Sequence, residues 1–323
     1  MKDKEQYSIG VDLGGTNIKI GLVSKDGKIV KKDKVPTNAG SGPESVVSQI
    51  KLSIHNILRK NDKKIKGIGI GSPGTVTLKG GVVEYPPNLP GWEKVRLGDI
   101  ISKEFELDTY VENDANAAAI GEMIFGNGKK LNSFIMVTLG TGVGGGIVFN
   151  RKLFRGEHGS AGEIGHMTID YSAGKCNCGS FGCVETFLGN HYIINSVRKK
   201  LPENMHSSIW KLIDNNFERL SPRVVQQAAE EGDSFAKQVI NDLGFYLGCC
   251  LASTADLLDI STFIIGGGVA GFGKPLFHAV EKAVETRVLR SIQERVKILP
   301  AKLRNDAGIK GASALVYYKL GDI

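Results

Sequence analysis

Three cysteines close together form the densest chemical signal in the chain. Cys176, Cys178 and Cys183 lie in one Gly-rich loop with the spacing Cys-x-Cys-x4-Cys. Such thiolates can converge on a zinc ion, which takes four ligands in tetrahedral structural sites. His166, ten residues before Cys176, is the best candidate for the fourth ligand. Because four protein ligands leave no position for water, the pattern favours a structural zinc. Redox chemistry and chance clustering are the alternatives.

Five polar residues, two after an earlier strand and three beside this loop, have the chemistry needed to hold a sugar. Asn113 and Asp114 follow a predicted strand, and Glu163, His166 and Glu185 flank the cysteine loop. Carboxylates accept several hydrogen bonds and an amide both donates and accepts, so together they suit a ring that carries several hydroxyls. The alternatives are that Asp114 caps the helix that follows it, and that the two glutamates are solvated loop residues.

Glycine-rich turns at the ends of three predicted strands indicate a nucleotide site. Without a Cβ, glycine lets backbone N–H groups approach phosphate oxygens closely. None of the turns has the Lys of a Walker A loop, and the first two lead into strands, unlike a dinucleotide fingerprint. Each turn alone is explained by a tight hairpin, but three together favour a nucleotide. The candidate residues are Asp12, Gly14, Gly15, Thr16, Gly140, Thr141, Gly142, Gly267 and Gly268.

Hydrophobic periodicity predicts the elements that position these residues. We expect strands at 7–12, 18–23, 28–35, 65–70, 108–112 and 262–265, and helices at 43–58, 115–125, 234–258 and 308–320. Loops are expected at 71–91 and 154–182, and a polar helical insert at about 200–222. The phrase at 11–16 recurs at 137–142, which suggests a duplicated architecture with a cleft between the halves.

Composition and charge narrow the class of protein. The 323 residues suggest two domains, for which we expect limits of 1–115 and 116–305, with the helix at 306–323 joining the first. The net charge is +7, but Lys and Arg are scattered among acids and no nucleic-acid motif is present, so a solvated surface is expected. The N-terminus is polar, and no apolar run is long enough for a signal peptide or a membrane span. We therefore expect a cytoplasmic protein with neither nucleic acid nor a membrane as partner. Cys249 and Cys250 are expected in the core.

Six motifs in order along the chain carry a resemblance to a known family. The chain resembles the ROK family (repressor, open reading frame, kinase), and within it the glucokinase-like members. The motifs are Asp12-Leu-Gly-Gly-Thr16, Gly71-Ser-Pro-Gly74, Glu112-Asn-Asp-Ala-Asn-Ala-Ala-Ala119, Leu139-Gly-Thr-Gly-Val-Gly-Gly145, Ala161-Gly-Glu-Ile-Gly-His166 and Cys176-Asn-Cys-Gly-Ser-Phe-Gly-Cys-Val-Glu185.

The resemblance implies an α/β, two-lobed actin-like ATPase or hexokinase fold, made of duplicated ribonuclease H-like domains. It implies that Asp114 is the catalytic base and that the two Gly-rich turns at 12–16 and 140–142 hold ATP phosphates with Mg²⁺. It also implies that His166 ligates a structural Zn²⁺ with the three cysteines, and that the chain forms a homodimer or homotetramer. The residues that would contact the sugar are Gly74, Asn88, Asn113, Asp114, Glu163, His166 and Glu185.

The expected activity is phosphorylation of a hexose, most simply glucose to glucose 6-phosphate in carbohydrate metabolism and glycolysis. The loop at 88–92, Asn-Leu-Pro-Gly-Trp, resembles the glucokinase type, with N-acetylmannosamine or another hexose as the alternative substrate. Repressors of the family carry an added N-terminal DNA-binding domain, for which we expect no room before residue 12. A sugar sensor without catalysis is the distant alternative.

Overall fold

The computed structural model describes residues 6–59 and 61–321. The start of the polar N-terminal stretch, Lys60 and the last two residues of the expected segment 306–323 lie outside the described residues. The chain divides into two compact units. Unit 1 comprises Met1–Met136, Gly146–Gly162 and Ala301–Ile323, and unit 2 comprises Val137–Gly145 and Glu163–Pro300. The expected domain limits at 115 and 305 stay a prediction. The two units group residues 116–136 and 146–162 with the first part of the chain.

Unit 1 is built on a five-stranded sheet in the order β3-β2-β1-β4-β8. The first three strands are antiparallel neighbours, and β4 and β8 run parallel to β1. Their bounds are β1 (Gln6–Leu13), β2 (Asn17–Ser24), β3 (Ile29–Pro36), β4 (Lys64–Ser72) and β8 (Thr109–Asn113). The helices of this unit are α1 (Pro43–Leu58), α2 (Leu97–Phe105), α3 (Asp114–Phe125) and α10 (Ala307–Leu320). The strands and helices expected in these regions are therefore confirmed within a few residues.

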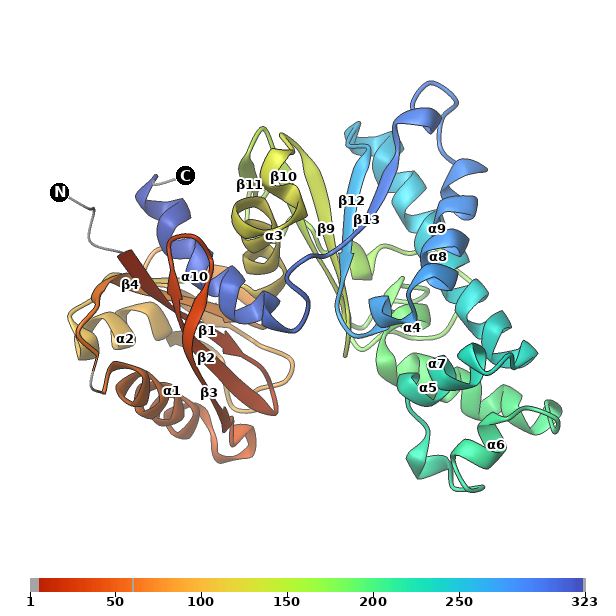
Figure 1. Cartoon of the computed structure of the whole chain (residues 1–323), viewed down its shortest axis with the longest axis horizontal. Helices are drawn as coiled ribbons and strands as arrows, with labels where there is room; N and C mark the ends of the chain where they lie inside the picture. The colour runs from red at the N-terminus through yellow and green to blue at the C-terminus, as the bar shows by residue number, and fades with distance from the viewer. Residues whose placement is uncertain (1–5, 60, 322–323) are drawn as a thin grey trace. The chain divides into compact units, whose positions relative to one another are not determined.

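Opposite faces of β1 contact different helices. Ile9 and Val11 belong to a buried cluster with the apolar face of α1, which begins at Pro43, a residue suited to a first helical turn. On the other face α10 lies over β1 and β4 (Figure 1). Gly10 of β1 and Gly69 of β4 face the backbone of this helix. A Cβ at either glycine would overlap a backbone carbonyl oxygen of α10. The helix therefore lies directly on the backbone of the sheet, which only glycine permits at these two positions.

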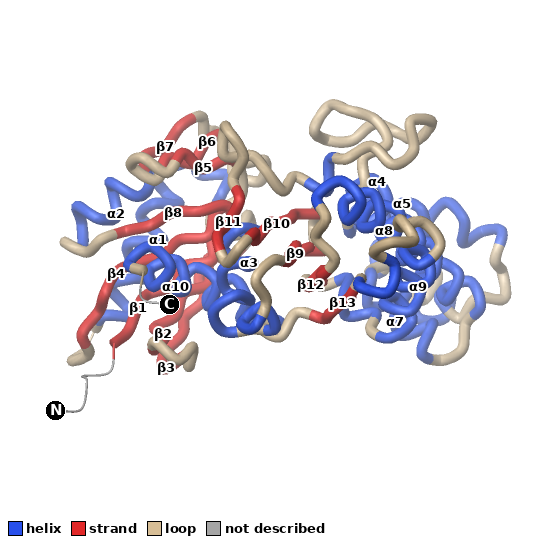
Figure 2. The backbone as a smooth tube through the Cα atoms, turned by 90° about the horizontal axis from the view of Figure 1, so that it is seen from above, coloured by secondary structure: helices blue, strands red, loops and turns tan. Residues whose placement is uncertain are grey.

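The loop expected at 71–91 contains regular structure, which corrects the prediction. A three-stranded antiparallel sheet forms from β5 (Thr75–Thr77), β6 (Val82–Glu84) and β7 (Lys94–Arg96), beyond β8 at the edge of unit 1 (Figure 2). Strands of three residues are too short for an alternating pattern to reveal them.

A second sheet has the order β11-β10-β9-β12-β13. Its strands are β9 (Phe134–Leu139), β10 (Val143–Phe149), β11 (Lys152–Phe154), β12 (Thr262–Gly266) and β13 (Lys297–Pro300). The helices of unit 2 are α4 (Glu185–Leu188), α5 (Asn190–Lys200), α6 (Ile209–Leu212), α7 (Pro222–Glu230), α8 (Ser234–Leu258) and α9 (Lys274–Glu285). The expected helix at 234–258 is confirmed at both ends. Cys250 is buried within it as expected, and Cys249 is partly exposed.

The polar insert expected to be helical at 200–222 is largely irregular. It holds one four-residue helix, α6, and two short 3-10 turns at Leu201–Glu203 and Phe217–Arg219. Asp214 and Asn215 both adopt positive φ, at 52° and 54°, which ends any helix there. Among the helices of the described residues, none combines the length and apolar character that a membrane span requires.

Candidate active site and metal centre

The carboxyl ends of three parallel strands gather the first set of candidate residues in unit 1. In the sheet register Asp12 of β1 pairs with Gly71 of β4, and the adjacent Ser72 pairs with Asn113 of β8. Two strand spacings separate Asp12 from Asn113, so their Cα atoms lie about 10 Å apart. The predicted phosphate turn and the predicted catalytic base therefore follow strands that end at the same edge of one sheet.

Asn113 is the residue that caps helix α3. Its Oδ1 accepts from the backbone N–H groups of Ala115 and Asn116 at 3.0 and 3.2 Å, and its Nδ2 donates to the Gly74 carbonyl at 3.2 Å. The alternative that Asp114 is the cap is therefore wrong. Asp114 is the first helical residue, and its Oδ1 accepts from the Ala115 N–H at 2.8 Å. The positive end of the helix dipole stabilises a carboxylate there.

A buried ion pair that the sequence did not reveal holds the backbone of this segment. Glu112 is 3% exposed, and its Oε2 accepts from Nε and Nη2 of Arg155 at 2.9 and 2.6 Å. Its Oε1 accepts from the Asn113 N–H at 3.1 Å and from Nδ2 of Asn116 at 3.2 Å. The Glu112 carboxylate thus accepts four hydrogen bonds, two at each oxygen. The pair of Glu112 and Arg155 therefore fixes the end of β8 at Asn113, which Asp114 follows.

The turn at 12–16 is a tight hairpin that Asn88 approaches. The Gly14 N–H donates to the Asn17 carbonyl at 3.1 Å, and a Cβ at Gly15 would lie 2.8 Å from the Cβ of Asn88. Thr16 is exposed. Lys19 on β2, which sequence reasoning missed, places its Nζ 3.3 Å from Asp12 Oδ2. A cation beside a Gly-rich turn is suited to bind phosphate. Because Asn88 also lies against Gly15, unit 1 brings a predicted sugar residue next to the predicted phosphate turn.

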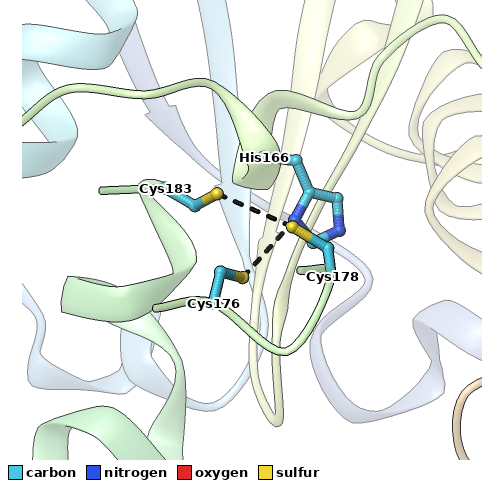
Figure 3. A group of neighbouring side chains, drawn as sticks. All are labelled: His166, Cys176, Cys178 and Cys183. Carbon is cyan, nitrogen blue, oxygen red and sulfur yellow. Dashed lines mark hydrogen bonds between the residues drawn. The ribbon is translucent and has the colours of Figure 1, made fainter. Parts of the chain in front are cut away.

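Four side chains of unit 2 converge in the geometry of a metal centre, as Figure 3 shows. The ligand atoms of His166, Cys176, Cys178 and Cys183 lie within 4.8 Å of one another. The distance from Cys178 Sγ to Cys183 Sγ is 3.7 Å, and from Cys176 Sγ to His166 Nδ1 it is 3.8 Å. A tetrahedral zinc with Zn–S bonds of about 2.3 Å separates its sulfurs by about 3.8 Å. The residues present therefore fit a four-ligand metal site, which we call the metal centre.

The thiols of the metal centre differ in acidity. Burial raises the pKa of Cys183 to about 12 and raises the pKa of Cys176 as well, whereas a hydrogen bond from the Ser180 backbone lowers the pKa of Cys178. The other ring nitrogen of His166, Nε2, points away from the sulfurs and lies 3.9 Å from Oε2 of Glu163, whose side chain is 52% exposed. A metal on Nδ1 would therefore leave Nε2 as a fixed N–H donor.

The glycine turn after β9 is the second part of unit 2's candidate site. The Gly140 N–H donates to the Gly142 carbonyl at 2.9 Å. A Cβ at Gly140 or at Gly268 would meet no atom within 4 Å, so these glycines face open space. Gly267 instead has a φ of 91° and lies against the backbone of Leu139, which brings the turn after β12 beside the turn after β9. Thr141, between Gly140 and Gly142, is exposed.

Glu185 is not a solvated loop residue, which excludes that alternative. It begins helix α4, and its Oε2 accepts from the Val143 N–H at 2.9 Å. Its Oε1 lies 3.9 Å from Cys176 Sγ. The predicted sugar ligand thus contacts both the end of the glycine turn and a sulfur of the metal centre.

Comparison with known proteins shows which family and which relatives this chain is similar to. The ROK family model matches residues 8–319. A glucokinase from Halalkalibacterium halodurans is 35% identical over 97% of this chain and 95% of its own length. A xylose repressor from Caldicellulosiruptor bescii is 31% identical over 95% of this chain and 77% of its own length.

A solved structure has the same fold over almost the whole chain. The crystal structure of a ROK family glucokinase from Streptomyces griseus, in complex with glucose and AMPPNP, matches with a TM-score of 0.85 and 33% identity. The match covers 96% of this chain and 98% of that one. The predicted sugar-kinase and actin-like ATPase fold is therefore confirmed, and the chain belongs to the ROK family.

Proposed function

We propose that this chain is an ATP-dependent hexose kinase that converts glucose to glucose 6-phosphate. The observation that carries the proposal is the position of Asp114. It lies in the first turn of α3, directly after β8, at the sheet edge where β1 leads into the Asp12–Thr16 turn. The similarity to glucokinases over nearly the whole chain supports the choice of reaction and of sugar.

In the proposed reaction Asp114 orients the primary hydroxyl of the sugar and accepts its proton as the oxygen attacks the γ-phosphorus of ATP. The bond from that phosphorus to the bridging oxygen breaks, and ADP leaves. Phosphoryl transfer depends mainly on positioning and charge neutralisation, so an Asp of ordinary acidity suffices. The proposed sugar-binding residues are Gly74, Asn88 and Asn113 in unit 1 and Glu163, His166 and Glu185 in unit 2, and each unit contributes one Gly-rich turn for the phosphates.

Metal ions support this assignment in two ways. Asp12 and Thr16 supply the oxygen ligands that Mg²⁺ prefers, and Mg²⁺ would neutralise phosphate charge. The metal centre would hold Zn²⁺ through three thiolates and His166, a closed set that gives structural support and leaves no position for a reacting water. His166 would then bind a hydroxyl through the N–H of its free nitrogen.

The test is ADP release by the purified protein with MgATP and a panel of glucose, mannose, fructose, N-acetylmannosamine and N-acetylglucosamine. We expect glucose to give the highest kcat/KM. Asp114→Asn should lose at least about two orders of magnitude in kcat, the lower range for general-base catalysis, while glucose binding is retained. Turnover of another sugar instead would reassign the substrate, and near-wild-type turnover by Asp114→Asn would remove the base.

The relation to a xylose repressor favours a second candidate, a regulator that binds a sugar without phosphorylating it. Sugar binding by calorimetry without ADP release in the same panel would establish it. Within the first proposal we place the enzyme in the cytoplasm, at the entry of glucose into glycolysis. We propose a homodimer or homotetramer, which light scattering on the purified chain tests.

A further inference from the structure

The carboxylate of Glu185 joins two parts of unit 2 that the proposed function treats separately. Oε2 accepts from the N–H of Val143, the residue that ends the glycine turn, at 2.9 Å. Oε1 lies 3.9 Å from Sγ of Cys176 in the metal centre. One side chain therefore touches both the turn assigned to ATP phosphates and a predicted ligand of the metal.

The turn is shaped to receive this carboxylate. A Cβ at Gly142 would overlap Oε2 of Glu185 and lie 3.2 Å from its Cδ. The φ of Gly142 lies outside the left-handed region, so an L residue could adopt this backbone. What excludes a side chain is the space that the carboxylate occupies. The glycine here is thus explained by Glu185 rather than by a phosphate.

The backbone that follows Glu185 holds the same turn. The Asn190 N–H donates to the Gly140 carbonyl at 3.0 Å, and the Gly189 N–H donates to the Glu185 carbonyl at 2.9 Å. On the other side, both the N–H and Oγ1 of Thr186 donate to the carbonyl of Cys183, at 2.9 and 2.7 Å. The segment from Cys183 to Asn190 therefore links the metal centre to the glycine turn without a long loop between them.

We propose that Glu185 is a positioning residue for the phosphate-binding turn, and that it makes nucleotide affinity depend on occupation of the metal centre. The inference rests on the proposed function, in which the turn at 140–142 binds ATP. A bound metal fixes Cys176 and Cys183, and these fix the start of α4 and the Glu185 carboxylate. Without the metal the carboxylate is less restrained, and the turn loses its hydrogen bond at Val143 and a neighbour for Gly142.

The test is calorimetric binding of ADP in the absence of sugar, with zinc-loaded and zinc-stripped protein and zinc content measured in each sample. Zinc removal should raise the Kd for ADP about fivefold or more, the effect of losing roughly one hydrogen bond that orders the turn. Glu185→Ala should raise the Kd similarly and should then respond little to zinc, because both changes act through one side chain. Glu185→Gln keeps an oxygen for the Val143 N–H and should stay near the wild-type Kd.

Two further variants separate this role from sugar binding. Glu163→Ala removes another predicted sugar ligand, which lies beside His166 Nε2 and not at the turn. It should weaken sugar binding and leave both the ADP affinity and its zinc dependence unchanged. Gly142→Ala should weaken ADP binding, and in the double variant with Glu185→Ala the added methyl should cost little more.

A second measurement guards against variants that lose zinc or unfold. Hydrogen exchange of the Val143 amide should be faster in zinc-stripped protein and in Glu185→Ala, and slow in Glu185→Gln. An ADP affinity and a Val143 exchange rate that ignore both zinc and Glu185→Ala would overturn the inference and leave the kinase proposal intact. Failure of the wild-type, zinc-loaded protein to bind ADP would overturn both.

Discussion

Replacing Arg155 by Met should destabilise unit 1 and slow catalysis together. The substitution keeps most of the side-chain volume but leaves the Glu112 carboxylate buried, at 3% exposure, without the two hydrogen bonds that its Oε2 accepts. Breaking a buried ion pair by removing one partner costs about 3–5 kcal/mol. The Arg155 side chain is 18% exposed, which admits some water and places the expected loss near the lower limit, about 3 kcal/mol.

That loss should lower the melting temperature of unit 1 by about 6–12 °C, at about 2–4 °C per kcal/mol for a unit of this size. Circular dichroism during heating measures it. Below the transition, at 25 °C, kcat should fall about tenfold or more, because the Glu112 carboxylate also holds the Asn113 N–H beside the proposed base. The Kd for ADP should stay unchanged, since among the described residues no hydrogen bond of this pair reaches the turn at 12–16 or the turn at 140–142.

Two variants sharpen the interpretation. Arg155→Lys keeps the charge but loses the forked contact and should recover part of both losses. Glu112→Gln combined with Arg155→Met removes the buried charge while an amide oxygen can still accept from Asn113, so it should be more stable than Arg155→Met alone. If Arg155→Met melts within about 2 °C of the wild type and keeps its kcat, the ion pair neither stabilises unit 1 nor positions Asn113 and Asp114.

Four other changes test the structure away from this pair. Glu122→Ala should cost about 2–4 kcal/mol in urea unfolding, because the buried N–H of Leu303 and the partly buried N–H of Asn127 lose the acceptor that a fully buried carboxylate supplies, and a cost under about 1 kcal/mol would contradict this. Lys31→Met should lower the melting temperature by a few degrees, since the Lys31 ammonium donates to three carbonyls at the end of α1, and no change would mean that water replaces it. Burial raises the pKa of Asp233, but hydrogen bonds from backbone N–H groups outweigh it and keep the pKa below its ordinary value. Its stabilisation is present above about pH 4 and lost as pH falls through the lowered pKa, so the deficit of about 1 kcal/mol in Asp233→Ala at pH 7 should vanish in acid. Removal of zinc by a chelator should increase proteolysis of the loop at 175–183 before either unit unfolds, and equal cleavage rates would argue against a structural metal.

Local chemistry explains which parts of the fold could be predicted from the sequence. Helix α8 has apolar residues at helical spacing over 25 residues, which marks its extent, and the cap residue Asp233 marks its start. The metal centre is visible because its three thiolates lie within eight residues of one another and have few other roles. Asp114 is a candidate because it lies between a predicted strand and a predicted helix, and only the family resemblance identifies it as the expected base.

Interactions between distant segments explain the rest. Arg155 lies 43 residues from Glu112 in a Gly-rich loop, where no sequence pattern distinguishes an arginine paired with a buried acid from a solvated one. Lys19 lies in a strand pattern that tells which face it occupies but not that Asp12 is its neighbour. Glu185 is predicted as a sugar ligand from its residue type, its place beside the cysteine loop and the family resemblance, but its contact with Val143 depends on how a loop 42 residues earlier is folded.

The packing of α10 against the glycines of β1 and β4 affects how the chain folds during its synthesis. The strands of that sheet leave the ribosome early, yet Gly10 and Gly69 expose backbone to water until Ile309 and Ala312 arrive. At synthesis rates of about 5–20 residues per second, roughly 180 residues and about 10–40 s separate the end of the first segment of unit 1 from completion of α10. Unit 1 therefore completes its fold only after unit 2 has been synthesised, and during that interval its sheet lacks the helix that covers one face.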